Sequence, residues 1–205
     1  MNALVKSTGF LPQEIVFRTK YYYENKKLQG RNIKGPAIII SNHTSVYDYA
    51  QFIFSFPTRT LRYQMAEVLF KKKPLAFFLR AMGGIYVNRD TADFSFVQES
   101  VDILAKGGVV GIFPESRLPR EGEERPLPFK ASAALIALMA DVPVIPVYTN
   151  GAYFSKKRAR VVIGAPLRAS DYCHPEKKEK ENLKNVTDVF YRKVIELKEL
   201  LDGQE

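Results

Sequence analysis

Residues 37–48 read Ala-Ile-Ile-Ile-Ser-Asn-His-Thr-Ser-Val-Tyr-Asp. The apolar run at the start, rich in β-branched residues, predicts a buried strand, Ala37–Ser41, and the polar residues after it predict a turn. His43 then lies at the carboxyl end of the strand, where α/β proteins usually place a ligand site. Asp48 follows five residues later, close enough to orient the imidazole ring and to stabilise its protonated form. This stretch therefore predicts an α/β fold with a general base at the edge of its sheet.

The spacing of His43 and Asp48 also fits a purely structural role. Residues five apart on an ideal helix are separated by about 140°, so the pair would not share a helical face. The two meet if His43 lies in the loop and Asp48 lies in the first turn of a helix with Thr44 or Ser45 as its N-cap. A histidine that hydrogen-bonds within a turn, with Asp48 favouring the helix N-terminus, has the same spacing.

Segments with strand and helix character alternate along the rest of the chain, as is typical of α/β proteins. For 205 residues we expect a single domain with a mixed, largely parallel central sheet flanked by helices. The predicted strands are Ala37–Ser41, Thr60–Met65, Gly84–Asn88, Val109–Phe113, Val144–Tyr148 and Arg160–Ile163. The predicted helices are Leu11–Glu24, Ser45–Phe54, Pro74–Met82, Ala92–Ala105, Ala131–Ala140 and Glu176–Leu201.

Composition narrows the classes of function. Lys and Arg exceed Asp and Glu by 31 to 22, a net charge of +9, so we expect an anionic partner. The basic residues are scattered and form no recognisable nucleic-acid-binding module, so we expect no nucleic-acid partner. The single cysteine, Cys173, excludes an internal disulfide, and the chain has no Cys/His cluster for zinc, so we expect no metal.

Membrane attachment is expected to be peripheral, because no apolar run approaches the ~20 residues that span a bilayer. Two segments, Leu11–Tyr23 and Leu69–Arg80, suit the headgroup boundary of a membrane. In the second, three consecutive lysines, Lys71–Lys73, lie beside large apolar side chains. A helix with a buried aromatic face and a solvated lysine end explains the same residues.

Other candidate site residues follow predicted strands. Arg89 ends the stretch Gly83–Arg89, and its guanidinium suits a phosphate, although an ion pair with Asp90 is the alternative. Glu115, at the end of a buried strand, is a candidate acceptor for a hydrogen bond from a substrate hydroxyl, or part of an ordinary strand exit. Lys130 follows the long loop Pro114–Pro128 and opens an Ala-rich helix, where its ammonium can meet a phosphate or remain solvated.

Two prolines interrupt the β-branched run Val142–Val147. Proline has no backbone N–H to donate to a neighbouring strand, and a central strand has neighbours on both sides, so this run predicts an edge strand or the rigid wall of a groove.

Taken in order, four of these stretches resemble the four sequence blocks of the glycerolipid acyltransferase family, over about residues 36–148. The blocks read Asn-His-Thr-Ser-Val-Tyr-Asp, Gly-Ile-Tyr-Val-Asn-Arg, Phe-Pro-Glu-Ser-Arg and Val-Pro-Val-Ile-Pro-Val. The third departs from the family's Phe-Pro-Glu-Gly-Thr-Arg: Ser116 replaces the glycine, and Arg117 comes one position early.

The resemblance implies an α/β enzyme that moves a fatty acyl group from an acyl thioester to the hydroxyl of a lysophospholipid. The donor would be acyl-CoA or acyl-acyl carrier protein, the expected acceptor is 1-acyl-glycerol-3-phosphate, and no further cofactor is implied. By resemblance, His43 is the catalytic base and Asp48 its orienting partner. The substrate-binding residues implied are Arg89, Glu115, Ser116, Arg117 and Lys130.

The implied partners are a lysophospholipid acceptor, an acyl thioester donor and an anionic membrane surface. We expect residues 1–30 to form an amphipathic helix that anchors the chain at the cytoplasmic face of the membrane, and residues 31–205 to form the acyltransferase domain. The alternative is a non-catalytic phospholipid-binding protein that keeps the basic groove and the membrane helix without catalysing transfer.

Overall fold

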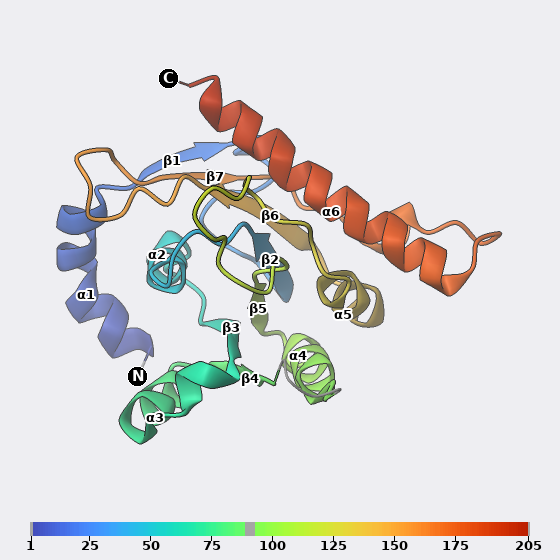
Figure 1. Ribbon diagram of the computed structural model, residues 1–205, viewed down its shortest axis with the longest axis horizontal. Coiled ribbons are helices and arrows are strands. Elements are labelled where there is room, and N and C mark those ends of the chain that lie inside the picture. The colour runs from blue at the N-terminus through green and yellow to red at the C-terminus, as the bar shows by residue number, and fades with distance from the viewer. Residues whose placement is uncertain (1, 89–92, 205) are drawn as a thin grey trace.

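The structure, a computed structural model, describes residues 2–88 and 93–204. In this part of the chain seven strands form one sheet with six α-helices around it (Figure 1). The strands are β1 (Lys20–Tyr23), β2 (Ala37–Ser41), β3 (Leu61–Ala66), β4 (Ile85–Val87), β5 (Val109–Ile112), β6 (Val144–Thr149) and β7 (Arg160–Ile163). The helices are α1 (Asn2–Phe17), α2 (Asp48–Ser55), α3 (Lys73–Ala81), α4 (Ser95–Ala105), α5 (Ser132–Ala140) and α6 (Glu179–Asp202), with short 3₁₀ helices at Glu67–Phe70 and Ser170–Tyr172.

Among the described residues, the strand order is β1-β7-β6-β2-β5-β3-β4. Neighbouring strands are parallel except for β6 and β7, which are antiparallel. The predicted α/β class, with a mixed, largely parallel sheet flanked by helices, is confirmed.

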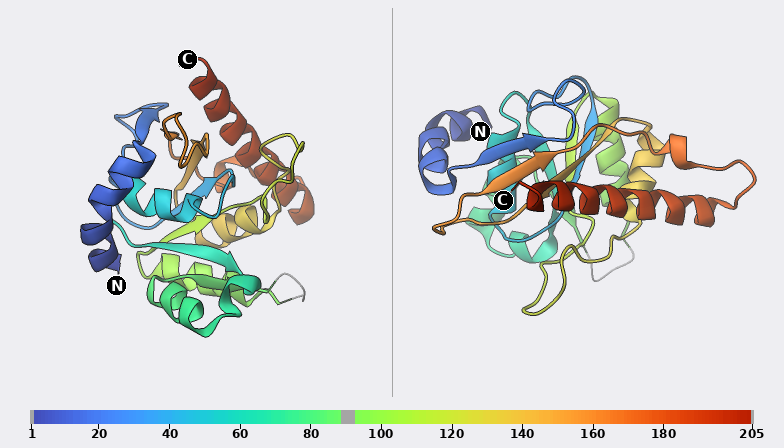
Figure 2. Two further views of the ribbon diagram at one scale, coloured as in Figure 1. Left: turned by 60° about the vertical axis from the view of Figure 1, so that its left-hand side comes forward. Right: turned by 90° about the horizontal axis from the view of Figure 1, so that it is seen from above.

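The central strand β2 is covered on both faces. Ile38 and Ile40 belong to the core beneath α4, α5 and α6, whereas Ile39 belongs to the opposite core, which contains Phe52 of α2. Figures 1 and 2 show these helices on the two sides of the sheet. All three isoleucines are fully buried, which explains why β2 reads as a continuous apolar run rather than as an alternating one.

The N-terminal segment differs from the prediction of a helix over Leu11–Glu24. Helix α1 ends at Phe17, and Lys20–Tyr23 form β1, which pairs in parallel with β7. Arg18 lies between them with a φ of 48°, a left-handed conformation that ends the helix. Three consecutive tyrosines favour a strand, and pairing with the edge of β7 outweighs continuation of the helix.

The prediction of an edge strand at Val142–Val147 is wrong, because β6 lies between β7 and β2. Pro146 lies opposite Gly164, the residue after β7, and its carbonyl accepts a hydrogen bond of 2.8 Å from the Gly164 N–H. The N–H that proline lacks therefore falls at the end of the β6–β7 ladder, where at most one ladder bond is lost.

Candidate active site

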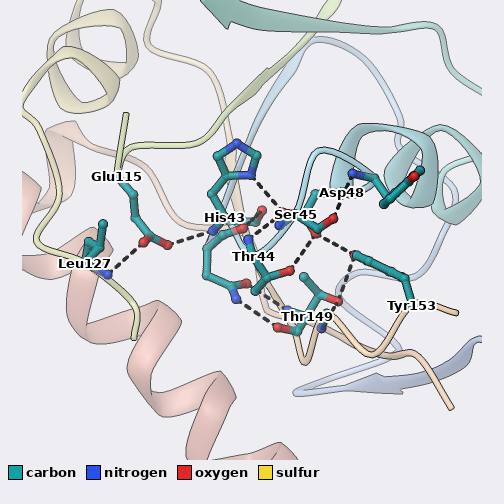
Figure 3. A network of polar contacts seen from close by, with 12 residues as sticks. His43, Thr44, Ser45, Asp48, Glu115, Leu127, Thr149 and Tyr153 are labelled. Atoms are coloured by element: carbon teal, nitrogen blue, oxygen red, sulfur yellow. Dashed lines mark hydrogen bonds and ion pairs between the residues drawn. The ribbon is translucent and has the colours of Figure 1, made fainter. Parts of the chain in front are cut away.

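The site forms where the carboxyl ends of β2, β5 and β6 meet at one edge of the sheet. These strands are parallel neighbours, with β2 between the other two. His43 follows β2, Glu115 follows β5 and Tyr153 follows β6, and all three take part in one network of polar contacts (Figure 3). The network joins loops that are far apart in the sequence.

His43 and Asp48 form a hydrogen-bonded pair, with 2.8 Å between His43 Nδ1 and Asp48 Oδ2. The carboxylate is fully buried, whereas the His43 side chain is 19% exposed. The second ring nitrogen, Nε2, lies on the opposite edge of the ring from Asp48 (Figure 3). One ring nitrogen is therefore oriented by a carboxylate, and the other is turned away from that partner.

Asp48 holds the loop before it as well as the histidine. Its Oδ2 also accepts hydrogen bonds from the backbone N–H groups of Thr44 (2.6 Å) and Ser45 (2.9 Å), and its Oδ1 accepts from the Thr44 hydroxyl (2.8 Å). Helix α2 begins at Asp48 after Tyr47, with no side-chain cap, so the predicted N-cap at Thr44 or Ser45 is wrong. Instead of a loop side chain accepting from the helix, Thr44 and Ser45 of the loop donate to the carboxylate of Asp48, the first residue of α2.

An aromatic stack fixes the plane of the imidazole. The rings of His43 and Phe113 are 4.2 Å apart between centroids and 13° from parallel. Phe113 in turn stacks on Tyr63 at 5.0 Å. The sequence predicts Phe113 as the last residue of a strand, but β5 ends at Ile112, and Phe113 begins the turn that carries Glu115. Phe113 is therefore part of the site.

Glu115 links two loops through their backbone. Its Oε1 accepts from the N–H of His43 at 2.7 Å, and its Oε2 accepts from the N–H of Leu127 at 2.8 Å. The residue is 3% exposed, and burial raises the pKa of its carboxyl above the ordinary value; the two amide donors offset only part of this rise. Since both oxygens already bond backbone donors, the geometry favours a positioning role for Glu115 over direct contact with a substrate hydroxyl.

Ser116 and Arg117 behave differently from Glu115. Ser116 has a φ of 62°, the left-handed conformation that glycine adopts without strain. Glycine is the residue at this position in the family's third sequence block. Arg117 donates to both carboxylate oxygens of Glu123, at 2.6 and 2.8 Å, and this bonding lowers the pKa of Glu123 to about 2. The Arg117 guanidinium thus pairs within its own loop.

Lys130 lies at the same edge of the sheet, because its N–H donates to the carbonyl of Pro114 (2.8 Å), next to Glu115. Its side chain is exposed, and α5 begins two residues later, at Ser132, rather than at Lys130. Arg89 lies outside the described residues; strand β4, which precedes it, ends at Val87.

The sequence prediction missed the loop after β6. The side-chain amide of Asn42 bonds both the carbonyl (2.8 Å) and the N–H (2.9 Å) of Thr149, and the Tyr153 hydroxyl donates to Asp48 Oδ1 at 2.7 Å. Gly151 has a φ of 63°, and a Cβ there would lie 2.6 Å from the Cβ of Thr44. The sequence does hold a signal for this loop: the pair Asn150-Gly151, which is typical of a turn, follows the predicted strand Val144–Tyr148.

Comparisons with known proteins point to one family. The family model described as Acyltransferase matches residues 18–150. The 1-acyl-sn-glycerol-3-phosphate acyltransferase of Bacillus subtilis is 28% identical over 170 residues, covering 80% of this chain and 82% of the relative. The protein of that name from Borreliella burgdorferi is 26% identical over 167 residues, and the match covers 75% of this chain but 63% of the relative.

A solved structure has a similar fold. The crystal structure of the 1-acyl-sn-glycerophosphate (LPA) acyltransferase PlsC from Thermotoga maritima aligns with a TM-score of 0.63 at 23% identity. The alignment covers 96% of this chain and 78% of the other. Nearly the whole of this chain therefore shares its fold with about four fifths of that protein.

Proposed function

Because this chain belongs to the acyltransferase family, we propose that it transfers a fatty acyl group from an acyl thioester to the hydroxyl of 1-acyl-sn-glycerol-3-phosphate, giving phosphatidic acid. The names of the Bacillus and Borreliella relatives support this acceptor. The observation that carries the chemistry is the 2.8 Å bond between His43 and the buried carboxylate of Asp48. The donor is acyl-CoA or acyl-acyl carrier protein.

The reaction needs a base, because an alcohol is a poor nucleophile at neutral pH. His43 Nε2 removes the proton from the acceptor hydroxyl as the oxygen attacks the thioester carbonyl. Asp48 stabilises the imidazolium that forms, since its Oδ2 accepts from Nδ1. When the tetrahedral intermediate collapses, the C–S bond breaks and the imidazolium returns the proton to the departing thiolate. The ester and the thiol are the products, and His43 is again neutral.

The direct test is acyl transfer by the purified chain. Labelled acyl-CoA and labelled acyl-acyl carrier protein are each incubated with a panel of lysophospholipids and with monoacylglycerol, which lacks the phosphate. We expect labelled phosphatidic acid from 1-acyl-glycerol-3-phosphate and little product from monoacylglycerol. Absence of transfer from both donors to every acceptor would contradict the proposal.

We infer that cationic side chains hold the acceptor phosphate. Lys130 is exposed beside the Pro114–Glu115 turn, and Arg89 is the residue of the second sequence block that the family resemblance associates with phosphate. Arg117 would first have to leave Glu123. The side chains of Arg117 and Glu123 are 44% and 32% exposed, and water screens an ion pair at the surface, so a phosphate can compete with Glu123 for the guanidinium.

Substitution of the cations should weaken acceptor binding more than turnover. We expect Arg89→Ala and Lys130→Ala each to raise KM for 1-acyl-glycerol-3-phosphate about 10–100-fold, because a charge-assisted hydrogen bond contributes roughly 1.5–3 kcal/mol. Steady-state kinetics with the acceptor varied measures this effect. Lys178→Ala, an exposed lysine just before α6, is the control and should keep the parent KM. If both site variants retain the parent KM, the phosphate assignment is wrong.

We also propose that the chain works at a membrane surface, where its lipid substrates reside. Leu4, Leu11 and Ile15 are seven and four residues apart on α1, so they form one stripe, and each is more than 60% exposed. Phe77 of α3 is 71% exposed and follows the exposed lysines Lys71–Lys73 by four residues in the sequence. No helix among the described residues has both the length and the apolar character required to cross a membrane.

The lysines should contribute a salt-dependent part of membrane binding. We expect Lys71/Lys72/Lys73→Glu to reduce co-sedimentation with anionic vesicles at low salt, because each lysine near the surface contributes roughly 1 kcal/mol. Salt should weaken the binding of the parent without abolishing it, since apolar insertion is not screened.

The control variant, Lys177/Lys178/Lys180→Glu, makes the same change in charge before and at the start of α6, at the end of the molecule opposite α1 (Figure 2). It should bind vesicles more strongly than Lys71/Lys72/Lys73→Glu does. Equal binding by these two variants would show that total charge, rather than this segment, governs attachment.

A further inference from the structure

We propose that Tyr153 is a positioning residue for the reaction: its hydroxyl fixes the rotation of the Asp48 carboxylate and sets how strongly that carboxylate holds the protonated His43. This inference rests on the proposed role of His43 as general base. Tyr153 lies beyond the four sequence blocks and beyond the residues that the family model matches. It reaches Asp48 from 105 positions away in the chain.

The two carboxylate oxygens of Asp48 accept hydrogen bonds from different parts of the chain. Among the described residues, Oδ2 takes three bonds from the local segment, those of His43 Nδ1, Thr44 N and Ser45 N. Oδ1 takes the Thr44 hydroxyl and the Tyr153 hydroxyl. The Tyr153 bond is therefore the one that ties the carboxylate to the loop after β6. Without it, Oδ1 would be held only from within the loop that it is meant to orient.

The Tyr153 hydroxyl belongs to a chain of hydrogen bonds that ends at Asp48. An ionised carboxylate can only accept, so the Tyr153 hydroxyl donates to Asp48. The Thr149 hydroxyl, 3.3 Å from the Tyr153 oxygen, is then able to donate to it, and it accepts from the N–H of Gly151 at 3.2 Å. Hydrogen bonds in such a chain polarise one another, so the donor at Asp48 is stronger than an isolated phenol.

The loop that carries Tyr153 is held in place independently of this bond. Asn42 bonds both backbone groups of Thr149, and the Tyr153 ring packs on Phe17 of α1 with centroids 4.9 Å apart. Burial and the neighbouring Asp48 raise the pKa of Tyr153 far above its ordinary value, so the hydroxyl keeps its proton at any working pH. The donor is therefore fixed in place and always protonated.

Tyr153→Phe removes the donor while keeping the ring. The Asp48 carboxylate then keeps more of its negative charge for His43, so the imidazolium is stabilised. We expect the midpoint of the His43 titration to rise by about half a pH unit, which is on the order of 0.7 kcal/mol. The acidic limb of the kcat/KM profile should move to higher pH by the same amount. At neutral pH kcat should fall several-fold with little change in KM, because the carboxylate is less well oriented.

The measurement is an NMR titration of the imidazole groups. The chain has two histidines, so a His174→Gln variant assigns the His43 signal directly. Thr149→Val, which removes the preceding hydroxyl, should shift the midpoint in the same direction by less, and it replaces Tyr153→Phe if that variant does not fold. Tyr172→Phe, in the 3₁₀ helix before α6, is the matched loss of a hydroxyl elsewhere and should leave the midpoint unchanged.

A midpoint that Tyr153→Phe and Thr149→Val leave unchanged in folded protein overturns the proposal, even if melting temperature or kcat falls, because a purely structural role does not alter the electrostatics at His43. The titration needs no substrate. If the parent chain transfers acyl groups to no acceptor, the proposed function fails, whereas the NMR result still decides whether Tyr153 controls the His43–Asp48 pair.

Discussion

His43→Ala is expected to lower kcat for acyl transfer by about 10²–10⁴-fold, the usual contribution of a positioned general base. Among the described groups that contact Asp48, the imidazole of His43 is the one base that can take the proton of the acceptor hydroxyl. The fold should survive, because Asp48 keeps its donors from Thr44, Ser45 and Tyr153. Steady-state kinetics and thermal unfolding of the same preparation separate lost chemistry from lost structure.

The second histidine supplies the control for that experiment. His174 is exposed in the loop before α6, and its Nδ1 lies 3.7 Å from Oε1 of Glu176. His174→Ala should retain the parent kcat and KM. Full activity in a folded His43→Ala chain would contradict the role of His43 as general base.

Asp48→Asn should produce the second largest effect, a loss in kcat on the order of 10²-fold or more. The amide can keep most of the geometry. Its oxygen can accept from the three N–H donors, and its nitrogen can face the Thr44 and Tyr153 hydroxyls, which are able to accept. What disappears is the negative charge that stabilises the imidazolium. The acidic limb of the kcat/KM profile should therefore move to lower pH, opposite to the shift expected for Tyr153→Phe.

The two substitutions should not be additive. His43→Ala/Asp48→Asn is expected to be about as slow as His43→Ala alone, because residues that act as one unit lose their function together. A double variant that is slower by the product of the two single effects would show that Asp48 acts independently of His43. Parent-level kcat in folded Asp48→Asn would reduce Asp48 to a structural residue.

The sequence by itself determined those features that depend on local chemistry. The alternation of strand-like and helix-like segments predicted the α/β class, and the run Ala37–Ser41 placed His43 at the carboxyl end of a buried strand, as found. Within the predicted helix Glu176–Leu201, the residues Val186, Phe190, Val194 and Leu197 are three or four positions apart, and all four are buried in α6. The spacing of His43 and Asp48 brought the two into bonding distance, because a turn followed by the start of a helix is a local structure.

Tertiary structure decided which loops meet. Glu115 reaches the N–H of His43 across 72 positions and Tyr153 reaches Asp48 across 105, because β5 and β6 flank β2 in the sheet. The order of strands is set by which apolar faces can be buried together, and no spacing within one segment records it. The same reason explains why Lys20–Tyr23 leave the predicted helix to pair with β7, and why proline-bearing β6 lies inside the sheet.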